Sequence, residues 1–191
     1  MQKRIVIFAS GNGTNAQNII RYFLHHPQVK VVRVLSNKKD AKVLERSKTL
    51  GIKAQSFTKE AFLDPGGVLK ILKRDRPNLI VLAGFLWKFP SLLLNEFHNK
   101  VINIHPALLP KYGGKGMYGN FVHEAIVANK EPETGITIHY VNEAYDEGAI
   151  IFQARVALEA DDTPEVVAGK VHKLEYEHLP KVIETLLLKK S

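Results

Sequence analysis

Short strand-like runs alternate with segments of helical spacing along the chain, and this alternation limits the possible folds more than any other feature. The first run, residues 4–9, is apolar without polar alternation, as expected of a strand buried on both faces. Four more strand-like runs follow at residues 29–35, 52–57, 78–83 and 101–105. Because helical segments separate them, we predict an α/β fold with a doubly wound, mostly parallel sheet.

Helix signals fill the gaps between these runs and continue beyond them. Helices are predicted from about residue 14 to 26, from 41 to 50, within 59–76 with an interruption at 64–67, and from 121 to 129. Residues 135–141 alternate apolar and polar, and 149–156 form a second strand that returns antiparallel. A last helix begins near Pro164 and runs to Leu187. We therefore predict one domain, residues 1–191, with a C-terminal antiparallel extension.

Composition excludes several classes of protein. The chain is 45% hydrophobic and 24% charged, which is typical of a globular domain, and it has no cysteine for disulfides, thiolate chemistry or metal binding. No clustered carboxylates or H-E-x-x-H pattern suggest a metal. No apolar run approaches the roughly 18 residues of a membrane span, and a strand begins almost at the N-terminus. We expect a cytoplasmic protein without membrane contact.

The charge is positive but dispersed. Lysine and arginine number 27 against 19 acidic residues, a net charge of +8, in scattered pairs rather than a basic stripe with interleaved aromatics. This pattern favours a lysine-rich surface that attracts small anionic substrates over a nucleic-acid partner.

Residues 101–110 combine a buried strand with polar side chains at its end. In strand geometry Asn103 and His105 share one face, opposite Ile102 and Ile104. Pro106 then ends the strand. The amide and the imidazole are therefore expected side by side at the carboxyl end of a strand, where ligands bind in open α/β sheets.

A glycine-rich turn, residues 10–16, joins the first strand to the first helix. It presents free backbone N–H groups and the positive end of a helix dipole, and Thr14 and Asn15 add side-chain donors, so phosphate is the expected guest. The turn also fits the dinucleotide pattern G-x-G-x-x-A, but the second strand ends in residues 36–39, Ser-Asn-Lys-Lys, rather than in the acid that this pattern requires. The lysines at 38–39 keep an NADP-like cofactor as an alternative, and a turn without a ligand is another.

Two loops have unusual compositions. Residues 84–90 carry three aromatic rings and no turn-forming polar residue, which fits either an apolar pocket for a flat aromatic ligand or core packing. Residues 111–119 include four glycines and are predicted to be a mobile loop with the properties of a lid.

The polar residues that suggest chemistry are Asn103, His105, His139 and Asp146. Asn103 offers a neutral donor to a developing oxyanion, and His105 can pass a proton near neutral pH or stabilise the oxyanion as an imidazolium. Asp146 could orient His105 and favour its charged form. An Asp before a Gly is, however, also typical of a turn with only a backbone role.

Five motifs, in this order, resemble those of the folate-dependent formyltransferases. They are residues 10–15, 83–85, 103–110, 135–139 and 146–148. The resemblance covers nearly the whole chain and is strongest to members that formylate glycinamide ribonucleotide in purine biosynthesis. It implies transfer of the formyl group of 10-formyltetrahydrofolate to the amino group of that ribonucleotide, with a reduced folate and a ribonucleotide as small-molecule partners and no metal.

The resemblance also implies roles for single residues. Asn103 and His105 would stabilise the oxyanion, and Asp146 would hold His105 and help relay a proton through water. Substrate would be bound by Gly13, Thr14, Asn15 and Glu175. The pterin pocket would be lined by Leu86, Trp87, Lys88, Phe89, Val141, Asn142 and Tyr145. The site would be supported by Thr137 and His139.

Some alternatives stay open at this point. The family often has Met-Arg-Ile-Leu where this chain has residues 86–89, and the loop at 113–119 is longer than usual, so the folate-tail contacts and the lid differ. A formyltransferase acting on a sugar amine and a non-catalytic nucleotide-binding module are the rival functions. The chain is expected to be a monomer or a homodimer.

Overall fold

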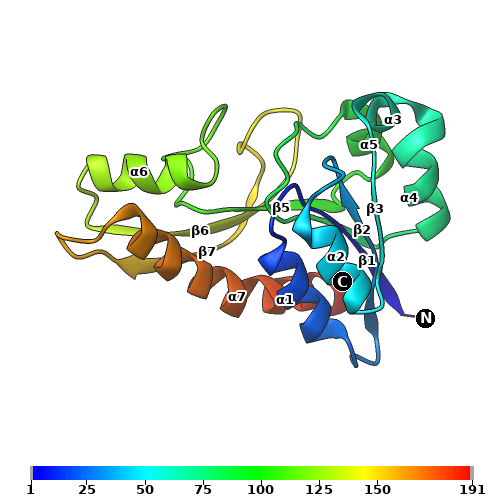
Figure 1. Ribbon diagram of the computed structural model, residues 1–191, viewed down its shortest axis with the longest axis horizontal. Helices are drawn as coiled ribbons and strands as arrows, with labels where there is room; N and C mark the ends of the chain where they lie inside the picture. The colour runs from blue at the N-terminus through cyan, green and yellow to red at the C-terminus, as the bar shows by residue number, and fades with distance from the viewer. Residues whose placement is uncertain (1, 190–191) are drawn as a thin grey trace.

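Seven strands form one sheet in the order β3-β2-β1-β4-β5-β6-β7 in the computed structural model, which describes residues 2–189 (Figure 1). The strands are β1 (Lys3–Phe8), β2 (Val29–Ser36), β3 (Lys53–Ser56), β4 (Leu79–Leu82), β5 (Val101–His105), β6 (Glu133–Tyr140) and β7 (Ile150–Ala157). The first five are parallel, and β6 and β7 continue the sheet antiparallel. The predicted fold class is confirmed. Met1, Lys190 and Ser191, which the predicted domain includes, lie outside the described residues.

The helices connect these strands. They are α1 (Thr14–Phe23), α2 (Lys42–Thr49), α3 (Lys59–Leu63), the π-helical turn η1 (Pro65–Leu69), α4 (Lys70–Asp75), α5 (Ser91–Glu96), α6 (Asn120–Ala128) and α7 (Pro164–Leu188). The predicted interruption at 64–67 is present, because Asp64 caps η1 and the backbone at Gly67 is not helical. None of the helices between residues 2 and 189 combines the length and apolar composition needed to cross a membrane.

Each face of the sheet carries its own apolar core. Along β1, Ile5 and Ile7 point to the face covered by α1, α2 and α7, whereas Val6 and Phe8 point to the face covered by α3, α4 and α5. All four side chains are fully buried, which explains the absence of polar alternation in this strand. Figure 1 shows α3, α4 and α5 grouped apart from α1, α2 and α7. α6 packs against α7 over the antiparallel part of the sheet.

Candidate active site

The antiparallel pairing of β5 and β6 assembles the first part of the site. Asn103 lies opposite His139 in the register, and His105 lies opposite Thr137. Ile102 and the other apolar residues of β5 point away into the cores. Directly opposed residues in an antiparallel pair have neighbouring side chains. The predicted pair, Asn103 and His105, therefore lies beside two polar residues of β6.

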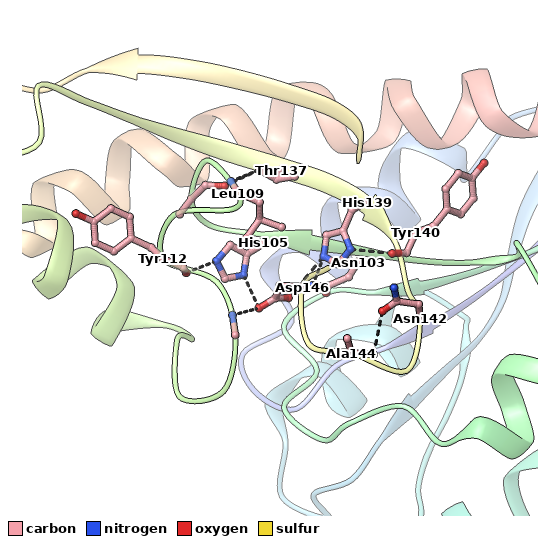
Figure 2. A network of polar contacts seen from close by, with 12 residues as sticks. Asn103, His105, Leu109, Tyr112, Thr137, His139, Tyr140, Asn142, Ala144 and Asp146 are labelled. Carbon is pink, nitrogen blue, oxygen red and sulfur yellow. Dashed lines mark hydrogen bonds and ion pairs between the residues drawn. The ribbon is translucent and has the colours of Figure 1, made fainter. Parts of the chain in front are cut away.

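Asp146 joins this group from the loop between β6 and β7. Its Oδ2 lies 3.5 Å from Nδ1 of His105, and its Oδ1 lies 3.6 Å from Nε2 of His139 and 3.5 Å from Nδ2 of Asn103. The N–H of Gly114 donates to Oδ2 at 3.0 Å. Figure 2 shows Asp146 between His105 and His139. The structure thus brings together Asn103, His105 and Asp146, although Asp146 is 43 residues distant from Asn103 in the chain.

The local backbone explains how Asp146 reaches this position. Asp146 itself has a left-handed φ of 57°. A Cβ at Gly148 would lie 1.7 Å from the carbonyl oxygen of Tyr140, so only glycine lets the loop approach the end of β6 this closely. Asp146 therefore both forms the turn with its backbone and contacts the other polar residues with its side chain.

His139 orients the amide of Asn103. Nδ1 of His139 lies 2.8 Å from the carbonyl oxygen of Tyr140, which can only accept, so Nδ1 carries the hydrogen. In the neutral ring Nε2 then accepts from Nδ2 of Asn103 at 3.2 Å. The second amide hydrogen has only the long contact with Asp146, which leaves it available to a substrate oxygen.

His105 is held on both sides of its ring. Nε2 donates to the carbonyl oxygen of Tyr112 at 2.7 Å, and Nδ1 faces Asp146. Burial lowers the pKa of His105 below its ordinary value of 6.5, against the opposing effects of the Asp146 charge and the Tyr112 hydrogen bond. His105 is therefore neutral at pH 7, with its free lone pair on Nδ1.

Asp146 is ionised in this setting. Burial alone would raise its pKa, but the contacts with His139 and His105 and the N–H of Gly114 together lower the pKa below 3.8. A carboxylate next to a neutral imidazole stabilises the positive charge that the ring gains when it takes up a proton. The pair is therefore suited to proton transfer.

Thr137 fixes the turn that follows His105. Its hydroxyl donates to the carbonyl oxygen of Ala107 at 2.7 Å and accepts from the N–H of Leu109 at 3.0 Å. Nε2 of Gln153 on β7 also donates to it at 2.9 Å. The hydroxyl is fully buried, so this supporting residue acts through the backbone of residues 106–110.

The glycine-rich turn forms a second part of the site at the start of α1. Gly13, with φ 71°, precedes the helix, and no side chain within residues 2–189 caps it, so the first-turn N–H groups are free for an anion. Nδ2 of Asn15 donates to Glu175 of α7 at 2.9 Å, and His172 shares the same oxygen at 2.8 Å. Glu175 is only 4% exposed, and Oδ1 of Asn15 is buried without a partner among the described residues.

The predicted pterin-pocket residues divide into buried and exposed groups. Phe89 is 3% exposed and packs edge-on against Phe8 at 5.3 Å, and Trp87 packs against the same core, so the core-packing alternative holds for these two rings. Leu86 is exposed, and Nζ of Lys88 lies 5.8 Å from the ring centre of Tyr145. The loop at 84–90 therefore meets the loop before Asp146 at the surface.

The two remaining pocket residues shape that second loop. Val141 packs against the core and donates its N–H to the carbonyl oxygen of Val101 at 2.9 Å. Oδ1 of Asn142 accepts from the N–H of Ala144 at 3.0 Å, which closes a local turn (Figure 2).

Sequence reasoning missed three participants. The carbonyl of Tyr112 and the N–H of Gly114 are backbone groups, which no residue type signals. His172 lies one helical turn before Glu175, and that spacing on one helix face was the available signal. Between residues 2 and 189 no group of three or more His, Asp or Glu residues could hold a metal ion.

Known formyltransferases resemble this chain over most of its length. The family model described as formyl transferase matches residues 3–183. The phosphoribosylglycinamide formyltransferase of Haemophilus influenzae is 38% identical, over 95% of this chain and 86% of that protein. The chloroplastic phosphoribosylglycinamide formyltransferase of Arabidopsis thaliana is 36% identical over 96% of this chain, which spans 66% of the plant protein and 61% of its Vigna unguiculata counterpart.

A solved structure supports the same assignment. The phosphoribosylglycinamide formyltransferase of Bacillus halodurans superposes with a TM-score of 0.87 at 34% identity, covering 98% of this chain and 96% of that one. The sequence match, the structural similarity and the matched length agree. This chain belongs to the formyl transferase family.

Proposed function

We propose that this chain transfers the formyl group of 10-formyltetrahydrofolate to the amino group of glycinamide ribonucleotide, in purine biosynthesis. The products are formylglycinamide ribonucleotide and tetrahydrofolate. One observation carries the proposal: Asp146 contacts both Asn103 and His105 at the carboxyl end of β5. The anion-binding start of α1 follows β1 at the same edge of the sheet, since parallel strands end together.

Asn103, His105, His139 and Asp146 form a polar cluster that would promote attack of the amine on the formyl group. The amine nitrogen bonds to the formyl carbon and the carbonyl oxygen becomes an oxyanion. The oxyanion then re-forms the carbonyl as the bond between that carbon and N10 of the folate breaks. The free amide hydrogen of Asn103 donates to the oxyanion. The proton lost by the amine passes to N10 by way of water, with Nδ1 of neutral His105 as acceptor and the Asp146 carboxylate stabilising the charged ring.

The substrate-binding residues support a ribonucleotide. The N–H groups around Gly13, Thr14 and Asn15 would bind its phosphate, with the helix dipole adding to the attraction. Glu175 would accept hydrogen bonds from the ribose hydroxyls, since its carboxylate is already oriented by Asn15 and His172. A carboxylate that accepts a hydrogen bond from a ribose hydroxyl is a typical mode of ribose binding.

The surface between residues 86–88 and 141–145 would bind the folate. Leu86 supplies exposed apolar area, and Lys88 lies over Tyr145 with a positive charge suited to the carboxylates of a folate tail. Residues 1–191 would act as one formyltransferase domain. Its cytoplasmic location, and whether it is a monomer or a homodimer, stay predictions.

The test follows the absorbance change as 10-formyltetrahydrofolate turns over, with and without glycinamide ribonucleotide. Turnover that requires the ribonucleotide supports the proposal. Turnover without it would indicate hydrolysis instead. Folate binding without turnover would contradict the assigned acceptor, and sugar amines would then be the acceptors to assay. Nucleotide binding with neither folate binding nor turnover would indicate a non-catalytic module.

A further inference from the structure

We propose that Tyr112 is a positioning residue for His105, and that its hydroxyl, bound by Asn129 and Glu131, keeps a backbone carbonyl on the ring. Its effect on turnover depends on the proposed function, whereas its effect on the His105 ring does not. We call Tyr112, Asn129 and Glu131 the Tyr112 clamp.

The carbonyl of Tyr112 determines which ring nitrogen of His105 carries the hydrogen. Its oxygen lies 2.7 Å from Nε2, and a carbonyl can only accept, so Nε2 is the donor (Figure 2). In the neutral ring Nδ1 then keeps the lone pair and faces Asp146 at 3.5 Å. Without the carbonyl, nothing at Nε2 would favour this tautomer over the other.

The backbone at Tyr112 does not adopt this conformation without support. Its φ is +55°, in the left-handed region that is disfavoured for residues with a Cβ, especially bulky ones. The next two residues are glycines, which add no stiffness to the loop. A contact elsewhere must therefore hold the residue in place.

The side chain of Tyr112 provides that contact. Its hydroxyl donates to Oε1 of Glu131 at 2.8 Å and accepts from Nδ2 of Asn129 at 2.9 Å. Both partners follow directly after α6, so the clamp ties the loop to the end of a helix. Hydrogen bonds from Tyr112 and Lys111 lower the pKa of Glu131, which keeps its carboxylate ionised as an acceptor at neutral pH.

The ring of Tyr112 packs against the core but is only partly buried. A cavity of about 260 Å³ lies beside the ring, lined by Lys111, Tyr112 and Glu131 together with residues of β6 and β7. A side chain bordering a cavity has free space into which it can move once its polar contacts are lost. Core packing and the bond from the N–H of Gly114 to Asp146 also hold this loop, and the hydroxyl supplies the anchor at Tyr112 itself that keeps the carbonyl aligned with Nε2.

Tyr112→Phe tests the clamp while keeping the ring. We expect kcat to fall about 10-fold or more, with KM for both substrates within about twofold, because a misplaced catalytic group affects the chemical step rather than binding. We also expect the acid limb of the pH profile to move to lower pH, since the Tyr112 hydrogen bond favours protonated His105, while Asp146, His139 and Glu175 stay in place. Unchanged or increased kcat would contradict the proposal.

The partner residues supply matched variants. Glu131→Ala should resemble Tyr112→Phe, and the double variant should be no slower than either single one, because both remove the same contact. Glu131→Gln keeps an acceptor oxygen and should retain most of the activity. Lys111→Gln removes only the exposed second partner of Glu131 and should leave kcat unchanged. Additive losses in the double variant would contradict a shared clamp.

A spectroscopic readout tests the ring without any substrate. In protein labelled with ¹⁵N histidine, His105, assigned by its loss in His105→Gln, should show a protonated Nε2 and an unprotonated Nδ1 at pH 7.5. Tyr112→Phe should convert this signal to a mixture of tautomers, with urea unfolding midpoints confirming that the variant is folded. An unchanged ring signal would overturn the proposal even if turnover fell, and a changed ring signal would support it even if the ribonucleotide is not the substrate.

Discussion

Asp146 connects the two halves of the polar cluster, because one carboxylate oxygen faces His105 and the other faces His139 and Asn103. It is ionised while His105 is neutral, so the pair can accept one proton with little rearrangement. His139 has a different part: it accepts one amide hydrogen of Asn103 and thereby aims the other. Asp146, His105 and His139 therefore have separate parts in the cluster.

The pH dependence of catalysis follows from the lowered pKa of His105. If neutral His105 accepts the amine proton, activity is lost as pH falls through its folded-state pKa, which lies below 6.5. We expect the acid limb of kcat/KM to be centred below pH 6.5. Rates measured from pH 5 to 8 check this, and a limb centred above 6.5 would indicate that the imidazolium is the active form.

Stability should depend on pH through the same residue. The unfolded chain takes up a proton on His105 near 6.5 and the folded chain only at lower pH, so the stability present above pH 6.5 is progressively lost as pH falls towards the folded-state pKa. We expect His105→Gln to reduce this slope in urea unfolding at pH 5 to 8. Buried His123, whose pKa is also lowered by burial, should account for part of what remains. An identical slope in the variant would contradict this.

At the scale of elements, the end of β5 depends on β6. Thr137 of β6 binds both Ala107 and Leu109, so the turn that ends the strand is fixed from the neighbouring strand. The α1 turn has a comparable dependence on α2. A Cβ at Gly13 would lie 2.2 Å from Cγ2 of Val43, and Val43 donates its N–H to the carbonyl oxygen of Gly11.

Thr137→Val should therefore destabilise the protein. The substitution keeps the shape but leaves a buried N–H and a buried carbonyl without their partner, which costs about 1–3 kcal/mol. Chemical denaturation measures the loss. Thr185→Val on the exposed face of α7 removes a comparable hydroxyl and should change stability by less than about 0.5 kcal/mol. Equal effects of the two substitutions would refute the special role of Thr137.

Gly13→Ala should weaken ribonucleotide binding and stability together. Gly51→Ala is the matched control, because Gly51 has a similar φ of +75° but nothing within 4 Å of an added Cβ. The control should lose about 1–2 kcal/mol from backbone strain alone, and Gly13→Ala should lose more. KM for the ribonucleotide should rise only in Gly13→Ala. A rise in KM for the ribonucleotide in both variants would show that the weaker binding does not come from the turn at Gly13.

The elements themselves were largely predictable from the sequence. Buried runs such as β1 and the alternation of β6 carry strong local signals, and Gly67 marks the break before α4. The lateral contact between residues 103 and 139 follows from the register, which local patterns do not specify. The role of the Tyr112 carbonyl could not be predicted, because every residue has a backbone carbonyl, whatever its side chain.

At the scale of the molecule, the sheet places two dissimilar sites along one edge. The start of α1 follows β1, the polar cluster follows β5, and β4 alone separates these strands. Glu175 on α7 closes the first site through Asn15, so a residue near the C-terminus completes a turn near the N-terminus. Figure 1 shows α7 running beside α1. The sequence alone indicated a phosphate turn, a polar strand end and Asp146 as a partner for His105. Only the resemblance predicted the role of Glu175, since so distant a contact leaves no local pattern.

The aromatic loop at residues 84–90 shows why composition alone left two interpretations open. Its three rings suggested either a ligand surface or a core, and the structure divides the segment between the two. Phe89 is enclosed by other rings, whereas Leu86 and Lys88 lie at the surface. Burial depends on the packing of α3 and β1 against this loop, which is decided by the whole fold.

The most direct test of the account measures transfer of a ¹³C-labelled formyl group from 10-formyltetrahydrofolate to glycinamide ribonucleotide by the wild type and by Asp146→Asn, with both dissociation constants determined in parallel. We expect a labelled ribonucleotide product from the wild type. In Asp146→Asn we expect transfer at least about 100-fold slower, with both dissociation constants within about threefold, because the carboxylate acts on the proton rather than on binding. Transfer by Asp146→Asn at the wild-type rate would contradict the central role of the cluster around Asp146.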